Sequence, residues 1–205
     1  PTMMGLKALP QPKDGKLIPA EAFGVKVISI GFLVKDGQPL IWRGPLLHST
    51  IKQFISDVEW GSLDYLVVDL PPGTGDVQLS LSQHIPVTCG VVVTTPQQIS
   101  VDDASRGIEM FQKLDIPIAG VVENMGGLEL PDGTIIDVFG SGGGEDMANK
   151  YNLNFLGRIP LDPNIRISGD SGTPIVVSNQ NAKVSVIFNG IAGKIASYIS
   201  QLVLK

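Results

Sequence analysis

The chain has 205 residues, 43% of them hydrophobic and 17% charged, which is enough to build one compact domain with a sizeable core. Its formal net charge of -5 and its pI of about 4.9 argue against a nucleic acid or an anionic membrane as the main partner, because both usually require a basic surface. The single cysteine excludes an intramolecular disulfide framework, and with no signal-peptide pattern and no apolar run long enough to cross a bilayer we expect a soluble, cytoplasmic protein.

The first part of the chain predicts a lead-in, a strand, a helix and a second strand. Residues 1–24 are rich in proline, glycine and lysine and predict a loop or an extended segment. A strand is predicted over 25–30, and apolar residues at helical spacing predict an amphipathic helix over 45–58. Residues 64–70 (DYLVVDL) form an apolar run without alternation, which is typical of a strand buried on both faces of a parallel sheet.

The rest of the chain alternates strands with helices, and this order predicts a parallel sheet with right-handed crossovers. The predicted strands are 89–95, 117–123 and 155–159. The predicted helices are 100–114, 142–151, a helical turn at 162–168, and 184–204; Ser100 and Asp103 resemble a capping box at the first of them. Polar, glycine-rich residues 125–139 predict a hairpin-like insertion. We therefore expect an α/β fold over residues 1–205, a single domain with a mostly parallel sheet flanked by helices.

The predicted strand 64–70 carries a carboxylate, Asp69, at its end and runs into Pro71-Pro72-Gly73-Thr74-Gly75. Ligands of open α/β sheets gather at the carboxyl ends of strands, where a carboxylate can be satisfied. Asp69 has the position of a Walker B carboxylate, which holds Mg²⁺ usually through water, while Gly73 and Gly75 would let the backbone approach a γ-phosphate and move when it leaves. A strand-to-helix turn, with Asp76 capping a helix that reaches Gln83, fits the same residues equally well.

Six motifs in chain order are similar to those of one protein family. They are IWRGP (41–45), DYLVVDLPPGTGD (64–76), VTTPQ (93–97), VENM (122–125), FGSGGG (139–144) and IPLDP (159–163). The chain resembles the Mrp/ApbC group along nearly its whole length. These are P-loop ATPases of the deviant Walker A class, related to nitrogenase iron protein and to MinD and ParA proteins, and they act as iron-sulfur cluster carriers or scaffolds.

The resemblance implies roles for particular residues. Asp69 would match the Mg²⁺-associated Walker B aspartate, and residues 71–75, with Gly73 and Gly75, the switch that senses the γ-phosphate. Asn124 would match the asparagine whose amide recognises adenine, and Pro160, Leu161 and Asp162 would lie along the other side of the base. Asn124 capping a turn and Pro160 ending a strand are the structural alternatives.

Two departures from the family pattern affect these expectations. The sequence contains no G-x-x-x-x-G-K-S/T motif, so we expect the chain as given to lack the P-loop and a central strand and to hydrolyse ATP poorly. It also lacks the C-x-x-C pair that family members with a bridging 4Fe-4S cluster carry between the two motifs at 122–125 and 139–144. Thiolates hold such clusters, so no cluster ligand is identified, and Cys89 is expected to be a small core residue.

The family resemblance implies an ATP-binding iron-sulfur cluster carrier or scaffold that uses ATP and Mg²⁺. A homodimer that delivers to apo iron-sulfur proteins is the implied assembly, with neither nucleic acid nor membrane as a partner. A non-catalytic, nucleotide-responsive scaffold is the first alternative, and the missing cysteine pair favours it. A MinD/ParA-like positioning ATPase is the second, although residues 184–204 are mainly apolar and neutral and lack the basic face of a membrane-targeting helix.

Overall fold

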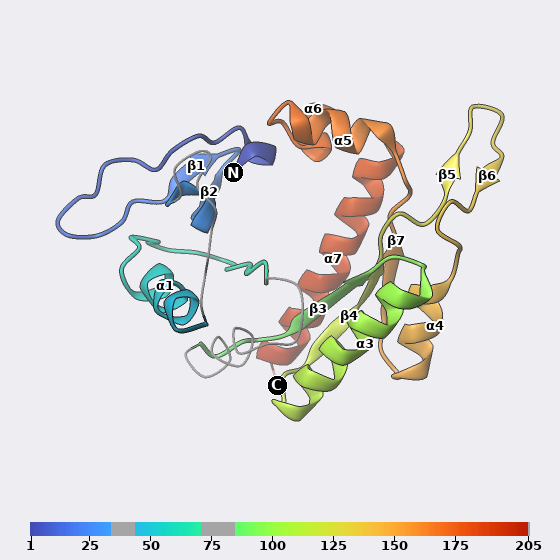
Figure 1. Cartoon of the computed structure of the whole chain (residues 1–205), viewed down its shortest axis with the longest axis horizontal. Helices are drawn as coiled ribbons and strands as arrows, with labels where there is room; N and C mark the ends of the chain where they lie inside the picture. Colours follow the sequence, from blue (N-terminus) through green and yellow to red (C-terminus); the bar gives the residue numbers. More distant parts are fainter. Residues whose placement is uncertain (34–43, 71–84, 205) are drawn as a thin grey trace. The chain divides into compact units, whose positions relative to one another are not determined.

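The computed structural model describes residues 1–33, 44–70 and 85–204, with the side chains of 44–48 left aside. The chain divides into two compact units (Figure 1). The first consists of Pro1–Ile85 with Ile167–Pro174, and the second of Pro86–Arg166 with Ile175–Lys205. The expectation of a single domain stays a prediction.

The first unit contains a small antiparallel hairpin. Strands β1 (Ala20–Ala22) and β2 (Val25–Val27) pair through a two-residue turn in which Phe23 and Gly24 both have positive φ, as a type I′ turn requires. The sequence predicted β2, although as a longer strand over 25–30. It missed β1, which lies within residues 1–24, predicted as a loop or an extended segment. Other elements in the described part of this unit are the 3-10 helices η1 (Thr2–Met4) and η2 (Ile30–Phe32) and the helix α1 (Gly44–Ser56).

The predicted strand at 64–70 is wrong in the structure. Residues 65–70 pair with no described strand, and their side chains are largely exposed, with Val67 at 89%. An apolar run predicts burial only where a neighbouring strand supplies hydrogen bonds, and β3, the first strand of the parallel sheet, pairs only with β4 among the described strands. The helix predicted over 76–83 lies outside the described residues.

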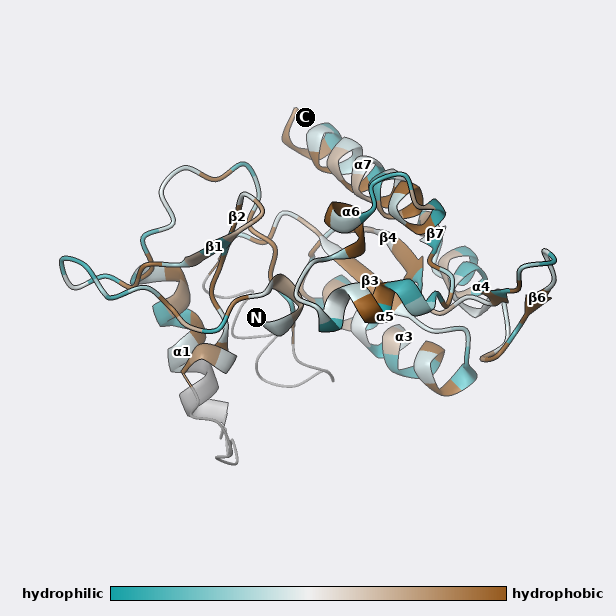
Figure 2. Ribbon diagram, turned by 90° about the horizontal axis from the view of Figure 1, so that it is seen from above, coloured by the Kyte–Doolittle hydropathy of each residue, from teal (hydrophilic) through white to brown (hydrophobic). Residues whose placement is uncertain are grey.

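The second unit is built on a three-stranded parallel sheet in the order β3-β4-β7, formed by Gly90–Thr94, Ile118–Glu123 and Phe155–Arg158. Every residue of β4 is buried, which explains its continuous apolar sequence. In Figure 2 β4 is brown, the colour of hydrophobic residues, whereas α3 carries teal, hydrophilic stretches. The prediction of an α/β fold with a mostly parallel sheet is confirmed.

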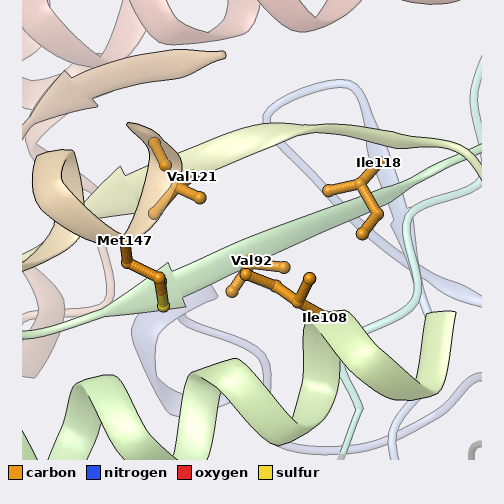
Figure 3. Close-up of a cluster of buried hydrophobic side chains, with 6 residues drawn as sticks. Val92, Ile108, Ile118, Val121 and Met147 are labelled. Atoms are coloured by element: carbon orange, nitrogen blue, oxygen red, sulfur yellow. The ribbon is translucent and has the colours of Figure 1, made fainter. Parts of the chain in front are cut away.

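Helices cover both faces of this sheet (Figure 1). Helices α3 (Gln98–Lys113) and α4 (Gly143–Lys150) pack on one face, where Ile108 and Met147 join Val92, Ile118 and Val121 in a buried cluster (Figure 3). Helices α6 (Ile175–Ser178) and α7 (Lys183–Val203) pack on the other. Their contacts there are Val122 and Leu156 against Ile175, Val184 and Ile191. This layering follows from the alternation of side chains along β4.

Two local predictions differ from the structure in detail. Helix α3 begins at Gln98 and not at Ser100, and no side chain caps its N-terminus. The predicted capping box is wrong because the Ser100 hydroxyl instead accepts a hydrogen bond from Thr95 Oγ1 at 2.7 Å. In the region of the expected insertion, β5 (Leu128–Glu129) pairs with β6 (Ile135–Ile136) in a short antiparallel hairpin.

Helix α7 is long and apolar compared with the other helices of the second unit. It has 21 residues and a mean hydropathy of 1.2 over its most apolar window, so by length and composition it could cross a membrane. The sequence predicted that no apolar run is long enough to cross a bilayer, and for α7 that prediction is wrong by length and composition. Its buried side chains, Val184, Ser185 and Ile191, pack within the second unit, and a single helix of this kind is weak support for a membrane span.

Candidate functional site

The three strands of the parallel sheet end side by side. Thr94 of β3 is in register with Glu123 of β4, which is in register with Arg158 of β7. The segments that follow these residues therefore leave the same edge of the sheet. In open α/β folds the carboxyl edge of the strands is where ligands bind.

Backbone hydrogen bonds join the three outgoing segments. The Asn124 amide donates to the Thr94 carbonyl at 2.7 Å, and the Leu161 amide donates to the Gly127 carbonyl at 2.8 Å. The Ile159 amide donates to the Glu123 carbonyl, also at 2.8 Å. The structure thus brings Asn124 together with Pro160, Leu161 and Asp162, four of the residues that the sequence selected.

Asn124 offers a free donor at this edge. Its side chain is half-buried, and its Oδ1 accepts a hydrogen bond from the Met125 amide at 3.0 Å. Because the atom facing an N–H must be an acceptor, this bond assigns the oxygen to the side of the Met125 amide and leaves Nδ2 on the opposite side. Within the described parts of the chain Nδ2 has no hydrogen-bond partner. The amide can therefore donate to a ligand.

Asp162 is engaged in a structural role. Its Oδ1 accepts hydrogen bonds from the backbone amide of Asn164 at 2.8 Å and from Asn164 Nδ2 at 2.9 Å. These bonds satisfy amide groups at the start of α5 (Pro163–Asp170), as an N-cap aspartate does. Pro160 and Leu161 are half-buried and connect β7 to this cap.

The residue before Asn124, Glu123, forms an ion pair with Arg158, which is 38% exposed, and the sequence analysis did not find this pair. The Glu123 side chain is 0% exposed; its Oε1 accepts from Arg158 Nε at 2.5 Å and its Oε2 from the Gly144 amide at 2.7 Å. The Nη2 nitrogen of Arg158 also lies 3.6 Å from Oε2 of Glu145. A glutamate ending an apolar strand and an arginine ending the next parallel strand are the signal that could have predicted the pair.

Asp69, Gly73 and Gly75 complete the set of residues that the sequence selected. Asp69 is exposed and belongs to the first unit, while Gly73 and Gly75 lie outside the described residues. Over residues 1–33, 44–70 and 85–204, no group of three or more His, Cys, Asp or Glu side chains is placed to hold a metal ion. Cys89 is half-buried just before β3, and burial raises the pKa of its thiol. A lone, protonated thiol does not fit an iron-sulfur cluster, which thiolates hold.

Comparison with known proteins identifies related families. A family model described as ParA, NUBPL iron-transfer P-loop NTPase, matches residues 1–196. A protein of Helicobacter pylori named iron-sulfur cluster carrier protein is 46% identical over 206 residues, which cover 98% of this chain and 56% of the relative. The protein of the same name from Escherichia coli K12 is 42% identical, covering 97% of this chain and 55% of the relative. This chain therefore spans little more than half the length of these relatives.

Solved structures support the same fold. A nucleotide-binding protein from Archaeoglobus fulgidus, in complex with ADP, is 33% identical with a TM-score of 0.67, and the match covers 84% of this chain and 66% of that one. The MinD cell division protein of Aquifex aeolicus is 23% identical with a TM-score of 0.54, covering 78% of this chain and 63% of that one. The prediction of a P-loop NTPase-like fold is confirmed.

Proposed function

Because the chain belongs to the ParA family of NUBPL-type iron-transfer P-loop NTPases, as its resemblance to the Mrp/ApbC group implied, we propose that it functions as an ATP-binding iron-sulfur cluster carrier. The observation that supports nucleotide binding is the free amide donor of Asn124 at the carboxyl edge of the parallel sheet, while the carrier role rests on the family. A planar, aromatic ligand with hydrogen-bond acceptors on its edge would suit that position. Pro160 and Leu161 would offer apolar surface to its ring.

Adenine matches the chemistry of the Asn124 side chain. The Nδ2 group can donate to a ring nitrogen of the base, and Oδ1 retains a second lone pair that can accept from the exocyclic amine. Asp162 would act indirectly, because its Oδ1 is engaged in the cap of α5, next in the chain to Pro160 and Leu161. In this proposal the base lies between the Asn124 turn and the segment 160–162.

The family resemblance assigns the phosphate side of the nucleotide to Asp69 and the turn that follows it. Asp69 supplies a carboxylate that can hold Mg²⁺ through water, and Mg²⁺ would neutralise charge on the phosphates. Gly73 and Gly75 would allow the turn to change conformation when the γ-phosphate leaves. We also propose that the protein hydrolyses ATP and forms a homodimer. It would deliver clusters to apo iron-sulfur proteins in the cytoplasm.

The iron-sulfur cluster is the cargo of the proposed carrier, and its mode of binding differs from that of relatives with a cysteine pair. Residues 125–139 contain no cysteine, and Cys89 is the one thiol of the chain. This observation favours a second candidate function, a nucleotide-responsive scaffold that holds partners and no cluster. The two functions share the nucleotide site and differ in whether iron binds.

Calorimetry with Mg²⁺-ATP tests the nucleotide site. The 205-residue chain and a longer chain, extended upstream through the P-loop segment of a relative, would be titrated beside Asn124→Ala and Asp69→Ala variants. We expect the extended chain to bind and Asn124→Ala to weaken binding roughly tenfold, the effect of one lost hydrogen bond. Asn149→Ala, on the exposed surface of α4, is the matched control and should leave binding unchanged. Absence of binding by both chains would reject the nucleotide site and favour a nucleotide-free scaffold.

A further inference from the structure

We infer that Glu123 and Arg158 are positioning residues that fix the Asn124 amide in one orientation and thereby make the site select adenine over guanine. The inference rests on the proposed nucleotide-binding function and adds a determinant of base specificity to it. Neither residue would contact the base. Both would act through the turn at 124–127, which carries Asn124.

The first step is the burial of the Glu123 carboxylate. Both of its oxygens are satisfied, Oε1 by Arg158 and Oε2 by the Gly144 amide at the N-terminal end of α4. A buried carboxylate is costly unless it is paired and hydrogen-bonded, so these contacts hold one another in place. Glu123 thus fastens β4, β7 and α4 together at the residue immediately before Asn124.

The second step is the close contact between Arg158 and the turn. A Cβ placed on Gly126 would lie 2.3 Å from Arg158 Cγ, 2.6 Å from Arg158 Cδ and 3.0 Å from Glu123 Oε1. The backbone at Gly126 therefore rests directly on the arginine side chain, at a distance that only glycine permits. Its amide also donates to the Ile159 carbonyl at 3.0 Å. The position of the ion pair thereby sets the position of the turn.

The third step connects the turn to the amide. Met125 has a φ of 58°, a left-handed conformation that is unfavourable for a residue with a side chain and persists only where neighbours enforce it. The peptide between Asn124 and Met125, whose N–H donates to Asn124 Oδ1, is held on both sides: the Asn124 amide donates to the Thr94 carbonyl at 2.7 Å and the Gly126 amide to the Ile159 carbonyl at 3.0 Å. While the bond to Oδ1 holds, the Asn124 side-chain amide cannot flip, and Nδ2 remains the free donor.

Orientation matters because adenine and guanine present opposite patterns. Adenine offers an amine donor beside a ring-nitrogen acceptor, whereas guanine offers a carbonyl acceptor beside an N–H donor, so an asparagine must flip its amide to satisfy the second base. A site whose polar groups are fixed rejects the base that leaves them unpaired. A loosened turn would accept both.

Two measurements on the same variants test the inference. Arg158→Met keeps most of the aliphatic stem and removes the guanidinium. The double variant Glu123→Gln with Arg158→Met removes the buried charge as well and keeps an acceptor for Gly144, so that it remains informative if the single variant fails to fold. The control is Arg106→Met, which removes an exposed pair with Asp103 at 3.0 Å, where the side chains are 67% and 72% exposed.

Hydrogen exchange should report how firmly the turn at 124–127 is held, and calorimetry should report the selectivity for ATP over GTP. We expect exchange at the amides of Asn124, Gly126 and Leu161 to accelerate roughly tenfold or more, beyond any change at the Ile191 amide in α7. We expect the ratio of ATP to GTP affinity, in the form of the chain that binds ATP, to fall roughly fivefold to tenfold. The control should change neither quantity.

The outcomes separate the inference from the proposed function. Uniform acceleration of exchange, or none, would overturn the inference. So would a faster turn with an unchanged ratio of ATP to GTP affinity, since the pair would then be merely structural. Failure of the unsubstituted chain, in both its forms, to bind either nucleotide would overturn the proposed function and the selectivity with it. Local acceleration of exchange together with a reduced ratio supports the inference.

Discussion

Glu123 and Asn124, which are adjacent at the carboxyl edge of the sheet, differ in how far the chain satisfies their side chains. Asp162 completes a helix cap, and Glu123 has partners on both oxygens. Asn124 uses only its oxygen. A satisfied polar group contributes to stability, whereas a half-satisfied one at a surface edge contributes binding capacity. This contrast is the reason that we propose Asn124 as a residue that contacts a ligand.

The Cys89 thiol should react slowly at neutral pH. Burial raises the pKa of this thiol, so at any given pH less of it is the reactive thiolate than in the unfolded chain. We expect alkylation by iodoacetamide at pH 8 to be slower for the native protein than for the chain in urea. The native rate should also continue to rise with pH above the usual thiol range.

The urea-unfolded chain is the control for this reaction, since Cys89 is the single cysteine and gives the only signal. Native alkylation as fast as that of the unfolded chain would contradict the expectation. It would indicate a stabilised thiolate and revive Cys89 as a ligand for iron.

At the scale of elements, α3 packs on the sheet through its one buried side chain, Ile108, and through the half-buried Val101, Ala104 and Phe111. Ile108 is 0% exposed and contacts the cluster of Val92, Ile118 and Val121 (Figure 3). Ile108→Ala should lower the free energy of unfolding by about 2–5 kcal/mol, since it removes buried methyl groups and leaves a cavity. Urea denaturation followed by circular dichroism measures the loss.

The same helix offers a matched control for that substitution. Ile99 is 74% exposed near the start of α3, and Ile99→Ala should change the free energy of unfolding by no more than about 0.5 kcal/mol. Equal effects of the two substitutions would mean that α3 does not pack on the sheet through Ile108.

The elements that the sequence predicted well are those whose burial is decided locally. The apolar runs that became β3 and β4 pair with each other across the single helix α3, so their partners are close in the chain. Residues 64–70 are equally apolar, yet they pair with no described strand. An apolar run indicates that a strand could be buried, but it does not indicate which strand would pair with it. The sequence therefore could not predict the strand pairing of residues 64–70.

The site was predictable to a similar extent. Asn124 and residues 160–162 followed from the resemblance to a known family, and the structure brings them together. The pair of Glu123 and Arg158 was missed because its members are 35 residues apart and meet only through the register of β4 with β7. Such a contact becomes visible once the strand order is known.

At the scale of the whole molecule, the two compact units differ in how far their apolar segments are buried and paired. The second unit contains both buried clusters and all three strands of the parallel sheet. The first contains the exposed apolar stretch 65–68. Exposed, unpaired backbone is open to proteases, whereas cleavage within a packed sheet requires unfolding.

Limited digestion with chymotrypsin should therefore cut after Tyr65 and Leu66 before it cuts after Tyr151 or Phe155 in the second unit. Mass spectrometry of fragments at early times measures the order. Tyr65→Ser should slow the first cut, and Tyr151→Ser should not. Earlier cleavage in the second unit would mean that its sheet opens more readily than its buried core implies. If instead the segment at 65–68 is protected, a partner covers it in solution, and a second copy of the chain becomes the first partner to test, by sedimentation.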